Sequence, residues 1–319
     1  VEEFALATAR EAPMAVVAMF QRPDYFAPQA ALYSRIAQQA AVTLVGLVGR
    51  APVWPPPGVA HVLLADTDPL AREWSVTVLT PRAGATVVGH DLEQVDGSAR
   101  SLEQGRTFTG RWSFRRADAY AELMRLRTTL GPRLGGSQNG ALDEVLHRIV
   151  PVPGTDTDVR HGAALSALLD RIAREHARAD AAAARIDQLA PGAERDPHSG
   201  LRNRLFLDRW TAGSADGTLA IGLILLRVHG LGTAGPRFGP RVDLAVTRSV
   251  AELLQGSTGA ADRAVRIGRE EFLLVLPGHD AGALAERAQR LQAAAAGLSA
   301  TYPFVPTPAT AVVTRTRER

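Results

Sequence analysis

Two adjacent carboxylates, Glu270 and Glu271, lie in a short charged segment between two apolar runs. The segment reads Gly268-Arg269-Glu270-Glu271-Phe272, and the flanking runs are Ala264–Ile267 and Phe272–Leu276. Short β-type runs on either side of a glycine predict a β-hairpin with both acids at its turn. Carboxylate oxygens are the ligands that hard divalent cations prefer. An Arg-Glu-Glu turn alone is usually a solvated turn, so its chemistry depends on what surrounds it.

The elements that must position these acids alternate between strand and helix. Leu219–Val228 is a continuous apolar run, which is typical of a strand buried on both faces. Pro240–Gln255 has apolar residues at helical spacing. After the hairpin come an alanine-rich helix, Ala281–Ala296, and a last strand, Thr310–Thr314. This order predicts an α/β fold with helices layered over a sheet.

The N-terminal half is also mixed α/β, and it ends in a turn-rich stretch, 150–156. Its β-branched and apolar runs predict three strands and two helices. The strands are expected at Val42–Val48, His61–Ala65 and Ser75–Leu79, and the helices at Gln29–Gln39 and Ala117–Leu126.

Residues 158–190 read as one long helix with a narrow apolar stripe. Seven of the eight positions a and d of its heptads are apolar, which is typical of a short coiled coil. The alternative is a single helix packed on one of the domains. Pro191-Gly192 then ends the helix. The proposed dimer stripe comprises Leu165, Leu168, Ile172, Ala179, Ile186 and Leu189.

Composition narrows the class of protein. At 319 residues and 46% hydrophobic content, the chain is long enough for two cores. Cysteine is absent, which excludes disulfides and thiolate metal sites. Lysine is absent too, so all 36 basic residues are arginines, and they are interspersed with 33 acids. Without a concentrated basic patch, we expect no nucleic-acid partner.

The chain also lacks the patterns of a membrane protein and of several enzyme classes. Its longest apolar stretches, Ala40–Gly49 and Leu219–Leu226, are shorter than the roughly 18 residues of a spanning helix. The start, Val1-Glu2-Glu3, has no basic region of a signal peptide. We therefore expect a cytoplasmic protein without a membrane partner. No Walker, dinucleotide or nucleophile-elbow motif occurs, and the histidines lack metal-ligand spacing.

Two segments together resemble the GGDEF family, the diguanylate cyclases. The turn Gly268–Phe272 resembles the family's Gly-Gly-Asp/Glu-Glu-Phe hairpin, which forms part of its GTP site. Asp196–Arg204, with the sequence DPHSGLRNR, resembles the opening motif Asp-x-Leu-Thr-Gly-Leu-x-Asn-Arg, although His198 and Ser199 replace Leu and Thr. The resemblance covers about residues 190–319 and implies a nucleotidyl-cyclase-like α/β sandwich.

The departures from this pattern fall on residues that the resemblance assigns to metal and nucleotide. The family closes its first strand with Asp-x-Asp-x-Phe-Lys, and here Arg227 replaces the metal aspartate and Gly232 the phosphate-binding lysine. The guanine-contacting asparagine falls near Gly235, so only Asp243 could still contact guanine. Joining two GTP molecules requires a divalent cation at the phosphates. The resemblance therefore implies a domain that has lost catalysis and has no catalytic residues.

Within the turn, Arg269 replaces the second glycine, where the family needs a small residue for close approach of the nucleotide. We expect its side chain to fill part of the pocket. Glu270 remains at the metal-binding position. We expect Arg227 and Glu270 to form an ion pair across neighbouring strands where the metal would lie. The alternative is that Arg227 points to solvent and the site is empty.

The resemblance also assigns roles to other single residues. The family's inhibitory site, Arg-x-x-Asp, matches Gly259-Ala260-Ala261-Asp262, which keeps the aspartate and lacks the arginine. Product binding is therefore not expected at this degenerate site. Asn203, Asp243 and Glu270 remain as vestigial nucleotide-binding residues by resemblance.

The N-terminal region resembles the DICT domain, a sensory module found with diguanylate cyclases and two-component proteins. The match rests on spaced aromatic and glycine residues, most of which would also serve as ordinary core. The segments that carry it are Phe20–Phe26, Tyr33, Leu44–Gly49, Glu73–Val76 and Phe108–Phe114.

These observations predict three segments: a DICT-like sensory domain (1–155), a helical dimerisation stalk (156–190) and a degenerate GGDEF domain (191–319). We expect a bacterial homodimeric regulator of cyclic-di-GMP-type signalling, with an unidentified protein partner or small-molecule signal. No cofactor is expected, and Mg²⁺ only if residual nucleotide binding survives. Two alternatives stay open. The protein could be a receptor for GTP, cyclic di-GMP or another small ligand, or a weakly active cyclase.

Overall fold

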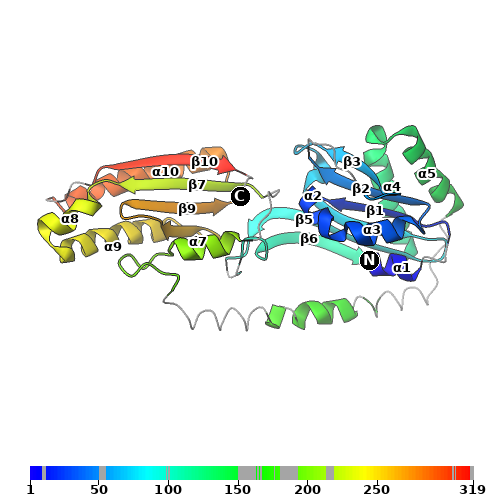
Figure 1. The fold of residues 1–319 in the computed structure, drawn as a ribbon, viewed down its shortest axis with the longest axis horizontal. Coiled ribbons are helices and arrows are strands. Elements are labelled where there is room, and N and C mark those ends of the chain that lie inside the picture. Colours follow the sequence, from blue (N-terminus) through cyan, green and yellow to red (C-terminus); the bar gives the residue numbers. More distant parts are fainter. Residues whose placement is uncertain are drawn as a thin grey trace. The chain divides into compact units, whose positions relative to one another are not determined.

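The computed structural model describes most of the chain, as two compact units (Figure 1). Unit 1 comprises Val1–Leu92 and Phe108–Ala179, and unit 2 comprises Glu93–Thr107 and Asp180–Arg319. The described residues are 1–8, 12–49, 55–97, 99, 101–149, 163, 165, 167–175, 177–179, 193–212, 219–303, 305 and 307–316.

Unit 1 is built on a six-stranded sheet with the order β3-β2-β1-β4-β5-β6. The first three strands are parallel, and β4 and β5 continue the sheet in antiparallel pairs. Every residue of β1 and β2 is buried, as expected for central strands with both faces covered. The strands are β1 (Ala15–Phe20), β2 (Val42–Val48), β3 (Ala60–Leu64), β4 (Glu73–Leu79), β5 (Gly84–Val95) and β6 (Arg106–Ser113).

Helices cover both faces of this sheet, so unit 1 has two cores. On one face, Phe20 and Val45 pack with Tyr33 and Ile36 of α3. On the other, alternate strand residues pack with α4 and α5, because successive side chains of a strand point to opposite faces. The helices are α1 (Glu2–Ala7), α2 (Pro23–Phe26), α3 (Ala30–Ala37), α4 (Arg116–Leu130) and α5 (Gly136–Arg148).

Unit 2 has a four-stranded antiparallel sheet with the order β10-β7-β9-β8. One face packs against α9 and α10, through Leu226 of β7, Val250 of α9 and Leu284 of α10. The strands are β7 (Ile221–Val228), β8 (Arg263–Arg266), β9 (Glu271–Pro277) and β10 (Ala309–Thr316). The helices are α7 (Arg204–Thr211), α8 (Leu231–Phe238), α9 (Pro240–Gly256) and α10 (Ala281–Gly297).

The opposite face of the unit 2 sheet holds a smaller core that includes a segment from the first half of the sequence. Val95 and Leu102 pack with Phe206 and Trp210 of α7, and the Leu102 N–H donates to the Trp210 carbonyl at 3.0 Å. Residues 93–107 are thus part of unit 2, whereas the sequence analysis placed them in the first domain. The difference arises because these apolar side chains complete the core beneath α7.

The predicted α/β class is confirmed for both units. The order strand, helix, hairpin, helix, strand in unit 2 is confirmed, with α8 as an additional helix between β7 and α9. In the predicted stalk, the described residues from 163 to 179 are helical, and Leu165, Leu168, Ile172 and Ala179 are exposed. The coiled coil stays a prediction, and its positions Ile186 and Leu189 lie outside the described residues.

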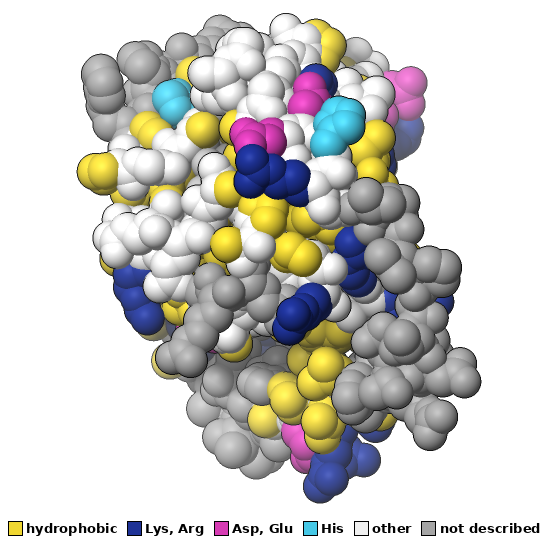
Figure 2. Space-filling model, turned by 90° about the vertical axis from the view of Figure 1, so that its right-hand side faces the viewer, with side chains coloured by type: hydrophobic (Ala, Val, Ile, Leu, Met, Phe, Trp, Pro, Cys, Tyr) yellow, Lys and Arg dark blue, Asp and Glu magenta, His cyan; other side chains and the backbone are white. Residues whose placement is uncertain are grey.

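None of the helices that the structure describes combines the length and apolar character needed to cross a bilayer. Figure 2 shows one face of the molecule, on which dark-blue arginine side chains lie singly among apolar, acidic and uncharged ones. The described part of this face carries no continuous basic surface.

Candidate functional site

The turn between β8 and β9 brings the two predicted acids to one end of the sheet. The N–H groups of Ile267 and Gly268 both donate to the Glu271 carbonyl, at 3.1 and 3.2 Å. The Val228 N–H donates to the Glu270 carbonyl at 2.9 Å, which joins the turn to the end of β7. Glu270 therefore lies beside the strand end where a metal ligand was expected from the resemblance.

Arg227 and Glu270 form the ion pair that the sequence analysis predicted. The distance between Arg227 Nε and Glu270 Oε2 is 3.7 Å, and the side chains are 53% and 21% exposed. Arg227 thus keeps contact with solvent while it faces the carboxylate. The exposed position limits the contribution of such a pair to stability to about 0–1 kcal/mol. Its importance is chemical, because it places a permanent cation beside the acid.

The second oxygen of Glu270 also has a partner within the fold. Glu270 Oε1 accepts a hydrogen bond from the Gly230 N–H at 3.0 Å. Gly230 has a φ of 93°, in the left-handed region that glycine adopts without strain. Both oxygens of the carboxylate are therefore engaged by groups on the segment that ends β7.

This arrangement does not fit a bound divalent cation. A metal that bridges phosphates needs several hard oxygen ligands, whereas here one carboxylate faces a guanidinium. Among the residues that the structure describes, no group of three or more histidine or acidic side chains could hold a metal ion. Arg269, which the sequence analysis placed in the nucleotide pocket, is exposed at the tip of the turn.

The start of α9 brings Asp243 close to Gly235. A Cβ atom added at Gly235 would lie 3.5 Å from the Asp243 Cβ, so a side chain at this position would contact the aspartate. Asp243 is in the first turn of α9, where an acid is favoured by the helix dipole. The two positions assigned to guanine are thus neighbours, and the role of Asp243 in binding stays a prediction.

Arg266 connects the opening motif to the signature turn, a role that the sequence analysis did not assign. Its Nη1 lies 2.9 Å from Asp196 Oδ1, while Nε and Nη2 donate to the carbonyls of Gly268 and Arg269 at 3.1 and 3.0 Å. Burial raises the pKa of Asp196, but hydrogen bonds from Ser199 and Arg266 outweigh it, and the net pKa lies below its usual value.

Asn203, predicted as a vestigial nucleotide contact, is the N-cap of α7. Its side-chain oxygen accepts from the Phe206 N–H at 3.1 Å, and its amide donates to the Ala193 carbonyl at 2.8 Å. This satisfies one of the free N–H groups at the helix start. A structural role accounts for these contacts, and the nucleotide role remains a prediction.

Asp262 of the degenerate inhibitory site is an internal residue. Its side chain is 4% exposed, and its carboxylate contacts Arg287 Nη2 at 3.0 Å and His279 Nε2 at 3.2 Å. Asp262 Oδ2 also accepts from the Gly259 N–H at 2.9 Å, which closes the turn. The carboxylate therefore holds the turn before β8 to α10 and to the end of β9.

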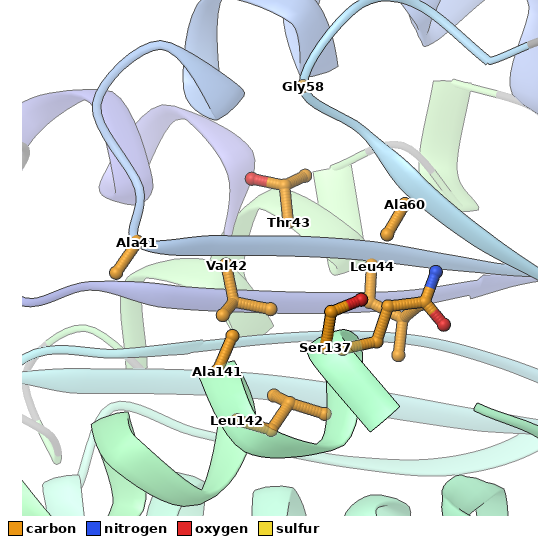
Figure 3. Close-up of a pocket in the computed structure, with 10 residues that line it drawn as sticks. Ala41, Val42, Thr43, Leu44, Gly58, Ala60, Ser137, Ala141 and Leu142 are labelled. Carbon is orange, nitrogen blue, oxygen red and sulfur yellow. The ribbon is translucent and has the colours of Figure 1, made fainter. Parts of the chain in front are cut away.

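A small cavity lies in unit 1 where β2 extends beyond the start of β3 (Figure 3). Its volume is about 170 Å³, below the range of about 300–1,000 Å³ of most ligand pockets. The Thr43 hydroxyl is buried without a hydrogen-bond partner among the described residues. Figure 3 shows Thr43 leaving β2 on the side opposite to Ala141 and Leu142 of α5. The polar groups thus do not converge, and this cavity is a poor candidate site.

Comparison with known families matches both halves of the chain. Residues 1–92 match the family described as a sensory domain in diguanylate cyclases and two-component systems, DICT. Residues 193–305 match the diguanylate cyclase GGDEF domain. A sensory α/β domain followed by a cyclase-type α/β domain defines a class of bacterial signalling proteins. This chain carries a DICT domain and a GGDEF domain and is a protein of the cyclic-di-GMP system, which confirms the predicted resemblance.

Solved structures similar to this chain are GGDEF proteins. The GGDEF domain of DgcB from Caulobacter crescentus, in complex with c-di-GMP, is 20% identical, with 39% of this chain and 78% of that chain covered and a TM-score of 0.34. The diguanylate cyclase SiaD from Pseudomonas aeruginosa, in complex with its activator SiaC, is 20% identical, with coverages of 64% and 73% and a TM-score of 0.35. No curated protein matches the chain.

Proposed function

We propose that this protein is a catalytically inactive member of the diguanylate cyclase class, and that it acts as a homodimeric sensor or scaffold in cyclic-di-GMP-type signalling. One observation carries the proposal: Arg227 stands where the family has a metal-binding aspartate, and it pairs with Glu270, the remaining metal-binding acid. The guanidinium supplies one positive charge where the divalent cation would supply two, and it has no coordination positions for phosphate oxygens.

The chemistry of the reaction explains why this exchange matters. Attack of a ribose 3′-hydroxyl on a phosphate requires that the cation neutralise the phosphate oxygens and position them. An arginine keeps its proton at physiological pH, so Arg227 cannot become neutral to admit a metal. The phosphate-binding lysine and the guanine-binding asparagine of the family are also absent, at Gly232 and Gly235. The absence of these contacts to phosphate and guanine supports the proposal that the domain does not convert GTP.

The connecting helix is compatible with a regulatory protein that does not convert GTP. The helix from 163 to 179 exposes Leu165, Leu168 and Ile172, so an apolar surface is available for a second copy of this chain. In the proposed dimer, unit 1 senses a signal and unit 2 presents a binding surface to a partner protein.

The test is incubation of the purified full chain with GTP and Mg²⁺ or Mn²⁺, followed by chromatographic analysis of nucleotides. We expect unchanged GTP and no cyclic dinucleotide, and any enzyme-dependent cyclic di-GMP would contradict the proposal. Calorimetry with GTP and with cyclic di-GMP separates a scaffold from a receptor. Tight binding of either would make unit 2 a nucleotide receptor.

A further inference from the structure

A second hollow of unit 1 lies between β6 and α4. Its volume is about 390 Å³, which is within the range of small-molecule pockets. Unlike the cavity of Figure 3, it is lined mainly by polar and charged side chains that come from β5, β6 and α4. Those that matter here are Thr86, Arg111, Ser113, Asp118, Glu122 and Arg125.

The inner wall of this hollow is an ion-pair network with two buried acids. Arg125 Nη2 contacts both oxygens of Glu73 at 2.7 and 2.8 Å, and Arg125 Nε donates to Glu122 at 3.0 Å. The side chains of Glu73 and Glu122 are only 8% and 3% exposed. Ser75 donates a further hydrogen bond to Glu73 at 2.8 Å. Two acids are thus held in place beneath the hollow.

Arg111 of β6 completes the network from the outer side. Its Nη2 lies 2.7 Å from Glu122 Oε2, and its side chain is 66% exposed. With Arg111, the two buried acids are matched by two guanidinium groups, so the four side chains are neutral together. Burial of charges is costly unless every group is satisfied.

The rim of the hollow offers hydrogen-bonding groups of both kinds. Glu122 occupies one nitrogen of the Arg111 guanidinium, which has several further N–H donors. Asp118, at the start of α4, accepts a hydrogen bond from Ser113 on Oδ2 at 2.6 Å and retains acceptor capacity on its other oxygen. A ligand in the hollow would therefore meet a cation on β6 and an anion on α4.

We propose that this hollow is the ligand site of the sensory domain, and that it binds a small zwitterion with a carboxylate and an ammonium group, such as a free amino acid. Arg111 binds the carboxylate with charge-assisted hydrogen bonds, and Asp118 binds the ammonium group. The lining has two arginines and two acids, and the buried Glu73 behind Arg125 adds a further negative charge, which disfavours a ligand with only anionic groups. The site belongs to unit 1 and does not depend on the state of the GGDEF domain.

The test is thermal unfolding of the full chain with each standard L-amino acid in millimolar excess. At about ten times its Kd, a binding amino acid raises the Tm by roughly 3 °C for a domain of this size. The amide and the N-acetyl derivative of the same amino acid should not raise the Tm, since each lacks one of the two charges. Absence of a shift with every amino acid, or an equal shift with succinate, would overturn the proposal.

Substitutions of residues that line the hollow test whether the amino acid binds there. We expect Arg111→Ala to weaken binding of the active amino acid at least tenfold by calorimetry. Asp118→Asn keeps the shape of the rim and should weaken binding to a similar degree, so the test remains decisive if the Arg111 variant folds poorly. Arg82→Ala removes an exposed arginine outside the hollow and is the matched control. Wild-type affinity in Asp118→Asn would place the ligand elsewhere.

Discussion

Arg227 reverses the charge of the position that closes β7. An aspartate at this position would add a second carboxylate next to Glu270, whereas the arginine removes the negative field that attracts a cation. The pair at 3.7 Å is half exposed, so its effect on stability is small. We therefore expect the residue to affect metal binding at the site more than the stability of the fold.

Restoring the aspartate alone should not restore synthesis. In Arg227→Asp, Gly232, Gly235 and Arg269 still differ from the family pattern. We expect no cyclic di-GMP after incubation with GTP and Mn²⁺, measured by chromatography. Robust synthesis by this single variant would show that the other three positions do not limit the site.

Asp262 should contribute strongly to stability. In Asp262→Ala, Arg287 loses its buried partner and the turn loses the hydrogen bond from Gly259. We expect the free energy of unfolding to fall by about 3 kcal/mol in urea denaturation. Glu286→Ala removes an exposed acid that pairs with Arg290 and should cost less than about 0.5 kcal/mol. A cost for Asp262→Ala as small as that of the control would refute the structural role.

The sequence allowed part of the site to be predicted. The pairing of Arg227 with Glu270 was predictable, because the motifs that contain them place the two residues at the ends of neighbouring strands. The partners of Asp262 could not be predicted, because His279 and Arg287 come from elements whose packing no local pattern encodes. Arg266 lies in the predicted strand Ala264–Ile267, yet its contact with Asp196 is visible only in three dimensions.

At the scale of elements, the signature turn is held by the loop before α7. Asp196 accepts hydrogen bonds from Ser199 and Arg266, and the same arginine binds two carbonyls of the turn. The loop and the turn are therefore joined by hydrogen bonds through Arg266.

The hydrogen bonds of Asp196 predict that the stability of the fold depends on pH. Since the folded-state pKa of Asp196 is below its unfolded value of about 3.9, its stabilisation is fully present above that value and is lost as the pH falls through the folded pKa. The wild type should lose more stability than Asp196→Asn between about pH 5 and pH 3, measured by urea denaturation. Parallel curves for the two proteins would show that the link contributes nothing.

Some elements with a continuous apolar run were predicted, as β2 and β7 were, but the equally apolar and buried β1 was not. The bounds of β2 agree with the prediction because all seven residues are buried and apolar or small. The strand β6 is exposed along most of its length, so its sequence lacks the alternation that marks a half-buried strand. The segment 93–107 joins unit 2 through side chains far along the chain, which a local pattern does not encode.

For the whole chain, we propose a sensory domain linked to an output domain that binds a partner and does not synthesise cyclic di-GMP. Exposed leucine and isoleucine side chains on the connecting helix are expected to join two copies. The hollow and the GGDEF site lie in different units, so the two proposals can be tested separately.

The proposed dimer can be tested by measuring the molecular mass of the protein in solution. Light scattering after size exclusion should give about twice the chain mass of 33.9 kDa. The double variant Leu168→Asp and Ile172→Asp places charges in the apolar stripe and should give the monomer mass. Ala167→Asp adds one negative charge outside the stripe, and the protein should remain dimeric. A monomeric wild type would contradict the stalk.

We infer from the Arg227–Glu270 pair that the GGDEF site does not bind metal-bound GTP. Calorimetric titration of the full chain with Mn²⁺ and GTPαS tests it most directly, because it measures binding without turnover. We predict no saturable binding in the micromolar range. One site per chain with a micromolar Kd, abolished by Glu270→Gln, would show that Glu270 still binds a metal beside Arg227 and would contradict the account.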